Sequence, residues 1–242
     1  MMAETFILKD LLKEKAEMFH VKLDETALER FDIYGKLLVE WNEKINLTAI
    51  TDPEGVTIKH FLDSITIFSY VDIPEGAKVI DVGTGAGFPG LAMLIARPDL
   101  EMTLMDSTKK RLMVIEDILE KLGLKANVVH SRAEDAGQNK AFREQYDFST
   151  ARAVTNLRDL AEYCMPFVKV GGSFIPMKSA KAQEEIAEGK KAIHVLGGQI
   201  IKQDTFELLD CGERTIINVK KISSTPAKYP RPSAKIAKNP IK

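Results

Sequence analysis

The stretch from Lys78 to Gly90 constrains the fold of this chain more than any other. It begins with a short, mostly apolar run, a pattern typical of a buried parallel strand. Glycines follow at every second position, at Gly83, Gly85 and Gly87. Pro89 suits the first position of a helix, because the N–H that proline lacks has no helical partner there. The stretch therefore predicts a strand, a tight turn and a helix whose free N–H groups and positive dipole end face the turn.

Two nucleotide-binding motifs overlap in this turn. Gly85-x-Gly87-x-x-Gly90 matches the dinucleotide fingerprint, in which a helix N-terminus binds a pyrophosphate. Two residues earlier, Asp81-x-Gly83-x-Gly85-x-Gly87 resembles motif I of the methyltransferases that use S-adenosylmethionine (SAM). Asp81 separates the two, because a carboxylate repels a pyrophosphate and attracts the ammonium of a methionine moiety. The sequence favours SAM, with a nicotinamide or flavin nucleotide and a turn without a ligand as the alternatives.

Charge and cysteine content narrow the class of protein. The 242 residues permit one large domain or two small ones, and their net charge of −1 predicts no partner. Lys220 to Lys242 holds seven basic residues and no acidic one, which leaves −8 for the rest of the chain. The two cysteines, Cys164 and Cys211, lack CxxC spacing, so neither a disulfide framework nor a zinc site is expected. With no apolar run of about 18 residues and no apolar signal core, the sequence predicts a cytoplasmic protein.

The pattern of elements divides the chain into three predicted parts. Residues 1–72 carry three helices that predict a cap packed on the sheet domain. Residues 73–222 alternate between strands and helices, as in a parallel sheet covered on both faces, and end in an antiparallel hairpin. Residues 223–242 are rich in proline, serine and lysine, which predicts a surface arm or a partly disordered tail.

The expected boundaries follow from periodicity and capping residues. Helices are expected at about 4–21, 24–48, 52–70, 89–96, 108–122, 156–168 and 180–196. Strands are expected at 78–82, 102–106, 126–130, 147–152, 172–177, 199–208 and 214–222.

Several polar residues come directly after predicted strands, where parallel sheets bind their ligands. Asp106 lies about 20 residues beyond the turn, where an acid accepts hydrogen bonds from ribose hydroxyls; alternatively it starts the next helix. The backbone of Ala133 and Glu134 can border an adenine, or the acids there can simply cap a helix. Arg152 and Lys178 end the fourth and fifth strands, and the planar fork of an arginine suits phosphate or guanine, although a surface ion pair is the alternative.

His60 and Asp63 share one face of the third helix, at a spacing of three residues. A single histidine on a partly apolar helix usually supports the fold, so a role for His60 in the site and a structural role both stay open. The other histidines, His20, His130 and His194, do not converge with it at a metal-like spacing. The sequence therefore predicts no metal site.

Together these motifs closely resemble the bacterial small-subunit ribosomal RNA methyltransferase G family, also called glucose-inhibited division protein B. The resemblance spans nearly the whole chain. Two departures are the Pro232-Ser233-Ala234-Lys235-Ile236 segment, where the family usually has a glycine, and Leu91 after the turn. The matching segments are His60-Phe61-Leu62-Asp63-Ser64, the loop from Asp81 to Gly90, Leu104-Met105-Asp106-Ser107 with Lys109-Lys110-Arg111, Ser131-Arg132-Ala133-Glu134, Ala151-Arg152-Ala153 and Tyr229-Pro230-Arg231.

The resemblance implies an α/β fold, namely the Rossmann-like seven-stranded fold of SAM-dependent methyltransferases, here with an N-terminal helical cap and a basic C-terminal tail. It implies SAM-dependent methylation of guanine N7 in 16S rRNA, and a cofactor site lined by Gly83, Phe88, Ala133, Glu134 and Arg152. Guanine N7 carries a lone pair in the neutral base, so no general base is required and positioning dominates.

The hypothesis for the remaining candidates is that Arg152 and Lys178 hold nucleotide phosphate or base, and that Asp63 faces the purine. His60 is a further candidate for the catalytic site, on the same helix face as Asp63. The expected partner is 16S rRNA or the 30S subunit. The protein is expected to be a monomer and to bind no membrane. A non-catalytic rRNA-binding assembly factor and a dinucleotide oxidoreductase are the rival functions. Salt-dependent contacts to RNA are expected from Arg132, Lys228, Arg231, Lys235 and Lys238.

Overall fold

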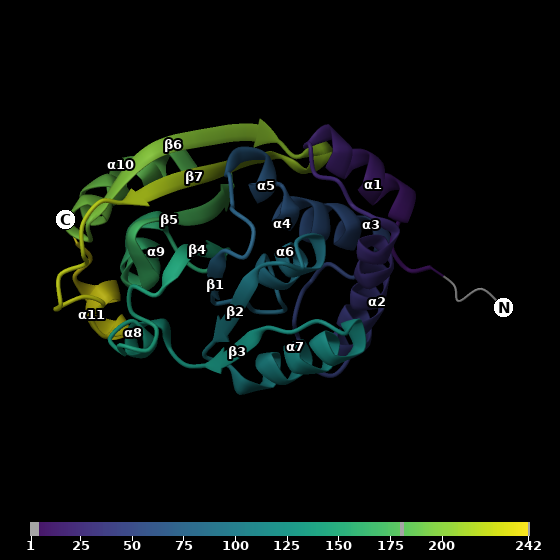
Figure 1. Cartoon of the computed structure of the whole chain (residues 1–242), viewed down its shortest axis with the longest axis horizontal. Helices are drawn as coiled ribbons and strands as arrows, with labels where there is room; N and C mark the ends of the chain where they lie inside the picture. Colours follow the sequence, from purple (N-terminus) through teal and green to yellow (C-terminus); the bar gives the residue numbers. More distant parts are fainter. Residues whose placement is uncertain (1–4, 180–181, 242) are drawn as a thin grey trace.

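Seven strands form one mixed sheet in the order β3-β2-β1-β4-β5-β7-β6 (Figure 1). The computed structural model describes residues 5–179 and 182–241 of the chain. Strands β1 to β5 pair in parallel, and β7 runs antiparallel between β5 and β6, so the hairpin predicted at the end of the sheet is confirmed. The strands are β1 (Lys78–Val82), β2 (Glu101–Asp106), β3 (Asn127–His130), β4 (Tyr146–Arg152), β5 (Val168–Ser179), β6 (Gly198–Glu207) and β7 (Glu213–Lys221).

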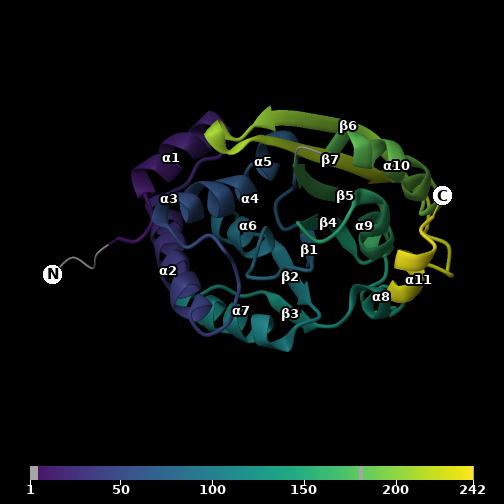
Figure 2. The ribbon, with the colours of Figure 1, turned by 180° about the vertical axis from the view of Figure 1, so that it is seen from behind.

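Helices cover both faces of the sheet. Neighbouring residues of each parallel strand point to opposite sides, and apolar residues on both sides have to be buried. In β1, Val79 belongs to one hydrophobic cluster, and Ile80 and Val82 belong to the other. Figure 2 shows the same two layers from behind. The first cluster includes α2 (Glu25–Asn42), α6 (Gly90–Ala96) and α7 (Lys109–Leu122), and the second includes α9 (Leu157–Cys164) and α10 (Ala182–Val195).

The N-terminal helices share their core with the sheet. The Asp24 side chain caps α2 by accepting a hydrogen bond of 2.7 Å from the Ala27 N–H, as its position before an apolar-periodic run predicts. Trp41 near the end of α2 donates its indole N–H to Asp117 on α7 at 2.7 Å. The helix expected at 4–21 is shorter, since α1 spans Lys9–Met18, and residues 1–4 lie outside the described ranges.

The segment expected to form one helix over 52–70 instead contains a π-helix, η1 (Val56–Leu62). Serine and threonine side chains compete here for helix carbonyls: Ser64 Oγ donates to the His60 carbonyl at 2.5 Å, and Thr66 Oγ1 donates to the Asp63 carbonyl at 2.7 Å. Single π-helical turns often mark functional sites. The remaining pieces of the segment are α3 (Pro53–Gly55), α4 (Asp63–Ile65) and α5 (Ile67–Tyr70).

Other boundaries differ by a few residues from expectation. Helix α6 begins at Gly90, so Pro89 occupies the N-cap and not the first helical position. The helix expected at 156–168 ends at Cys164, because Pro166 cannot continue it, and a 3₁₀ turn, η2 (Met165–Phe167), follows. The predicted start of the next helix at 180–181 lies outside the described residues. The short helices α8 (Ala133–Ala136) and η3 (Leu209–Cys211) complete the elements before the tail.

The C-terminal segment lies at the surface, as expected, and a few of its side chains anchor it to the second face. Its apolar side chains Tyr229, Ile236 and Ile241 are buried, and Ile236 lies in the short helix α11 (Ser233–Lys238). In Figure 1, α11 lies beside α8 and α9. Arg143 donates to the carbonyl oxygens of Thr225 and Tyr229 at 2.7 Å each, so a guanidinium compensates for the sparse secondary structure here. None of the helices in the described ranges has the length and hydropathy to cross a bilayer.

Candidate active site

The glycine turn after β1 is tied to β2 and to the helix that follows. The N–H groups of Gly83 and Thr84 both donate to the Met105 carbonyl at 2.9 Å. Asp81 Oδ2 accepts the Gly90 N–H at 2.8 Å, at the start of α6. A Cβ at Gly90 would lie 2.8 Å from that same oxygen, so the bond requires glycine there. Asp81 therefore ties the end of β1 to the start of α6 and holds the turn between them.

The turn leaves two buried polar atoms unsatisfied. Neither Asp81 Oδ1 nor Thr84 Oγ1 has a hydrogen-bond partner among the described residues. Burial raises the pKa of the Asp81 carboxyl to about 6, against the opposing effects of the Thr84 hydroxyl and then of the Gly90 N–H. Asp81 is fully buried, so its carboxylate acts on a ligand at the turn through its charge and through the backbone that it holds. Gly85 offers room, because a Cβ there would meet no atom closer than the Gly83 carbonyl oxygen at 4.0 Å.

A cavity of about 460 Å³ opens beside the turn. Asp106 orders one side of it, since its Oδ2 accepts the Gly85 N–H at 3.0 Å and its Oδ1 accepts the Thr108 N–H at 2.7 Å. The sequence left two roles open for Asp106, ribose acceptor and start of the next helix. The bond from the Thr108 N–H, just before α7, agrees with the second role, and each oxygen keeps a lone pair for a ribose hydroxyl, so the first role stays a prediction. Four of the predicted cofactor residues line this cavity, namely Gly83, Asp106, Ala133 and Glu134, together with Arg132 and with Ser233 and Ala237 of the tail.

Phe88 lies in a stack of rings between the turn and the N-terminal helices. The His60 imidazole stacks on it with centroids 4.5 Å apart, and Tyr34 stacks on it at 5.4 Å. The Arg152 guanidinium lies over the same ring at 5.1 Å. Phe88 is buried, so it supports Arg152 from below.

His60 is held as a neutral imidazole. Its Nε2 pairs with Thr48 Oγ1 at 2.8 Å, while its Nδ1 is buried without a partner in the described part of the chain. Burial, and then the neighbouring Arg152, lower the pKa of His60 to about 4. His60 therefore adds no positive charge to the site near neutral pH.

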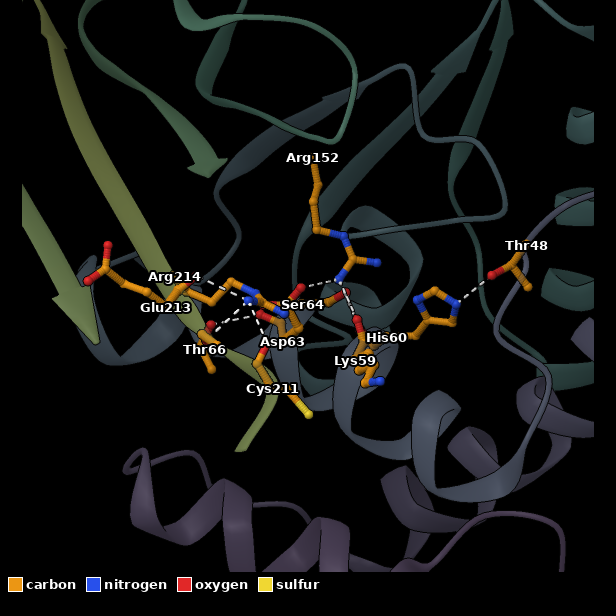
Figure 3. A network of polar contacts seen from close by, with 11 residues as sticks. Thr48, Lys59, His60, Asp63, Ser64, Thr66, Arg152, Cys211, Glu213 and Arg214 are labelled. Atoms are coloured by element: carbon orange, nitrogen blue, oxygen red, sulfur yellow. Dashed lines mark hydrogen bonds and ion pairs between the residues drawn. The ribbon is translucent and has the colours of Figure 1, made fainter. Parts of the chain in front are cut away.

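A second cavity, of about 530 Å³, lies where Arg152 ends β4. Figure 3 shows its polar network. Asp63 is the centre, because Arg152 Nη1 donates to its Oδ2 at 2.7 Å and Arg214 Nε donates to its Oδ1 at 3.0 Å. The Asp63 side chain is 7% exposed, and both of its oxygens are occupied. These contacts indicate that Asp63 positions two arginines. Asp63 also lines the cavity, so its expected contact with the purine stays a prediction.

Lys178 reaches the same cavity and is already neutralised. Its ammonium pairs with Glu185 at 2.7 Å and donates to the Thr155 carbonyl at 2.5 Å. Glu185 also accepts the Leu157 N–H at 2.7 Å, at the start of α9. These bonds favour a role for Lys178 in holding the segment after β4, rather than the nucleotide contact that the sequence predicts.

The two cavities adjoin. Ala153, Val154 and Thr155 line both of them and so form the wall between the turn side and the arginine side. Ala153 has a φ of +55°, a left-handed conformation that costs a non-glycine residue about 1–2 kcal/mol.

The residues expected to bind RNA divide into two groups. Arg132, Lys228, Lys235 and Lys238 are exposed, as an RNA contact requires. Arg231 is not available: its Nη2 pairs with Glu162 at 2.6 Å, and the Glu162 side chain is 1% exposed. Arg231 therefore serves the packing of the tail.

Arg214 is the residue that sequence reasoning missed. It begins β7, and an antiparallel strand begins at the edge where its parallel neighbours end. The register pairs Arg214 with Ser179, next to Lys178 at the end of β5. The predicted hairpin therefore already placed an arginine near the start of its second strand, at the edge of the sheet where the site lies.

The sequence of this chain is similar to proteins of a known family. A model of the rRNA small subunit methyltransferase G family matches residues 27–215. The protein named ribosomal RNA small subunit methyltransferase G from Alkaliphilus oremlandii is 46% identical over 238 residues, which cover 97% of this chain and 99% of that protein. The chain belongs to the rRNA small subunit methyltransferase G family. The methyltransferase G of Geobacillus thermodenitrificans is also similar, with 48% identity over 223 residues that cover 91% of this chain and 94% of that protein.

Solved structures agree on the fold. A SAM-dependent O-methyltransferase from Thermotoga maritima aligns with a TM-score of 0.55 at 16% identity, covering 78% of this chain and 73% of that one. The fibrillarin pre-rRNA processing protein of Methanococcus jannaschii aligns with a TM-score of 0.51 at 13% identity, covering 63% of this chain and 71% of that one. The Rossmann-like methyltransferase fold and the methyltransferase G family, both expected from the sequence, are confirmed.

Proposed function

We propose that this member of the methyltransferase G family transfers a methyl group from SAM to N7 of a guanine in 16S rRNA. The observation that carries the proposal is the pair of adjoining cavities that share Ala153, Val154 and Thr155. One cavity borders a glycine turn with unsatisfied buried acceptors, and the other carries two arginines. Donor and acceptor binding sites must adjoin in this way for direct transfer between them.

Residues at the first cavity and at the glycine turn recognise different parts of the methyl donor SAM. Asp81 lines neither cavity and favours the ammonium through its charge and through the turn that it holds. Asp106 accepts from ribose hydroxyls, and the backbone of Ala133 and Glu134 borders the adenine. Phe88 acts indirectly, by supporting Arg152. When bound, SAM supplies an electrophilic methyl group on a sulfonium.

The residues of the acceptor side have a positioning task. Guanine N7 attacks with its own lone pair, so no side chain has to remove a proton. A neutral His60 agrees with this mechanism, because it adds no positive charge that would repel the purine as it becomes cationic. Arg152, held by Asp63 and by the Phe88 ring, orients the nucleotide.

Calorimetry and a methylation assay test the function. We expect the purified chain to bind SAM and not NADH, and to transfer labelled methyl from SAM to 16S rRNA or to 30S subunits from cells that lack this protein. NADH binding without SAM binding would support an oxidoreductase. RNA binding with neither cofactor would support a non-catalytic assembly factor.

Donor affinity should depend on pH through Asp81. The pKa of this carboxyl is raised to about 6 in the free protein, so it is neutral below pH 6 and has no charge to attract an ammonium. We expect SAM affinity to be constant above pH 6 and to weaken by up to about tenfold per pH unit below it. Calorimetry between pH 5 and 8 measures this, and Asp81→Asn should bind weakly with a flat profile. An Asp81→Asn profile that still falls below pH 6 would assign the titration to another group.

The substrate form and the surroundings of the enzyme are part of the same proposal. It acts as a monomer in the cytoplasm on 16S rRNA, free or in the 30S subunit, and Arg132, Lys228, Lys235 and Lys238 follow the RNA backbone. These four side chains lie near the donor cavity or on the tail that closes it. Sedimentation with and without 30S subunits tests both the oligomeric state and the partner.

A further inference from the structure

We propose that Arg214 and Arg152, held together by Asp63, form a clamp for one phosphate of the RNA backbone next to the methylated guanosine. This inference rests on the proposed function, because it names the chemistry of the acceptor cavity. The clamp joins three parts of the chain that are distant in sequence: the π-helical segment, the end of β4 and the start of β7. Figure 3 shows the two guanidiniums converging on Asp63.

Hydrogen bonding fixes one part of each guanidinium and leaves another part unused. Arg152 Nη1 donates to Asp63 Oδ2 and to the Lys59 carbonyl, the latter at 3.2 Å. Arg214 Nε donates to Asp63 Oδ1, and its Nη1 donates to the carbonyls of Cys211, Gly212 and Glu213 at 3.1–3.2 Å. Within the described residues, Nε and Nη2 of Arg152 and Nη2 of Arg214 have no partner. Both side chains line the second cavity.

The charge of this cavity favours an anion. Its lining carries four cationic side chains, of Lys59, Arg152, Lys178 and Arg214, and two carboxylates, of Asp63 and Glu185. The imidazole of His60, whose pKa is lowered to about 4, adds no charge. Two positive charges are therefore uncompensated among the described lining residues. A neutral base offsets neither of these charges, whereas a phosphodiester offsets one of them, and guanidinium forks match phosphate oxygens.

The rigidity of the arrangement suits positioning. The side chains of Arg152 and Arg214 are 13% and 19% exposed, far less than those of ordinary surface arginines. Because Asp63 holds both, the free N–H groups are set before RNA arrives, which lowers the entropy cost of the contact. Arg214 is thus a positioning residue that acts on the RNA backbone beside the reacting base.

Arg214→Gln tests the clamp, with Lys121→Gln as the matched control. Lys121 lies in the last turn of α7, at the opposite edge of the sheet, and pairs with Asp117 at 2.9 Å. We measure RNA binding over a range of salt concentrations, methylation at saturating SAM, SAM affinity by calorimetry and thermal unfolding. We expect Arg214→Gln to weaken RNA binding about 10- to 100-fold and to reduce the salt slope by about one, with SAM affinity unchanged. Lys121→Gln should leave all four unchanged.

Arg214→Lys keeps the charge and removes the fork. It should restore most of the salt slope while the methylation rate stays low, which a purely structural role for Arg214 does not predict. Weaker RNA binding with an unchanged salt slope would overturn the phosphate assignment in favour of a base contact. Wild-type RNA binding and rate in Arg214→Gln would overturn the clamp altogether. A wild-type protein that fails to bind SAM or to methylate RNA would instead refute the proposed function.

Discussion

Arg152→Ala should lower the single-turnover rate of methylation at saturating SAM by about 100-fold or more, because loss of position at the reacting group has effects of that size. The guanidinium lies over Phe88 at 5.1 Å and is bound to Asp63 at 2.7 Å, so its removal frees both the nucleotide and the wall between the cavities. The fold should survive, since Asp63 keeps its bond to Arg214. Quenched-flow transfer of labelled methyl measures the rate.

Arg97→Ala is the matched control for this prediction. Arg97 is also partly buried and ion-paired, with Asp99 at 2.7 Å, but it follows α6 at the opposite edge of the sheet. Its removal should leave the rate unchanged. Arg152→Lys should fall between the two, because a lysine restores the charge without the planar fork. A wild-type rate in Arg152→Ala would remove this residue from the acceptor site.

Arg231→Ala should lower the free energy of unfolding by about 3–5 kcal/mol, the usual effect of removing one partner from a buried ion pair. Glu162 accepts from Arg231 Nε at 2.8 Å, from Nη2 at 2.6 Å and from the Arg231 N–H at 2.9 Å. Only the last of these bonds remains in the variant, beside a carboxylate that is 1% exposed. Urea unfolding measures the change, and the tail should become sensitive to proteases first.

Two further variants show whether the loss of stability comes from the unpaired buried Glu162 carboxylate or from the loss of a positive charge in the tail. Lys235→Ala removes an exposed basic residue of the same tail and should change stability by less than about 0.5 kcal/mol. Glu162→Leu combined with Arg231→Met removes both charges and should recover most of the loss, because no unpaired carboxylate remains. A loss below about 1 kcal/mol in Arg231→Ala would mean that the tail opens enough to hydrate Glu162.

Much of the site could be predicted because it follows strand ends. Asp106 and Arg152 end parallel strands, and Gly83 and Ala133 follow within three residues of one; such strand ends meet at one edge of the sheet. Asp81 was identified for its charge, but its bond to the Gly90 N–H depends on the path of the turn, which local pattern does not reveal.

The π-helix and the docking of the tail could not be predicted for a different reason, because both depend on side-chain contacts. The π-helical segment depends on side-chain bonds to carbonyls, which leave the hydrophobic periodicity unchanged. The tail lies at the surface, as its composition predicts, but the bonds that anchor it come from Glu162 on α9 and from Arg143. Such partners lie 69 and 82 residues away in sequence, beyond any local signal.

Periodicity, glycine spacing and strand-end residues were sufficient for the alternation of strands and helices, the turn and the family, because each depends on neighbours along the chain. The pairing of Asp63 with two arginines, the neutral state of His60 and the burial of Arg231 depended on packing between distant segments. Charge balance and desolvation are properties of the assembled interior, so they appear only when the folded chain brings those groups together.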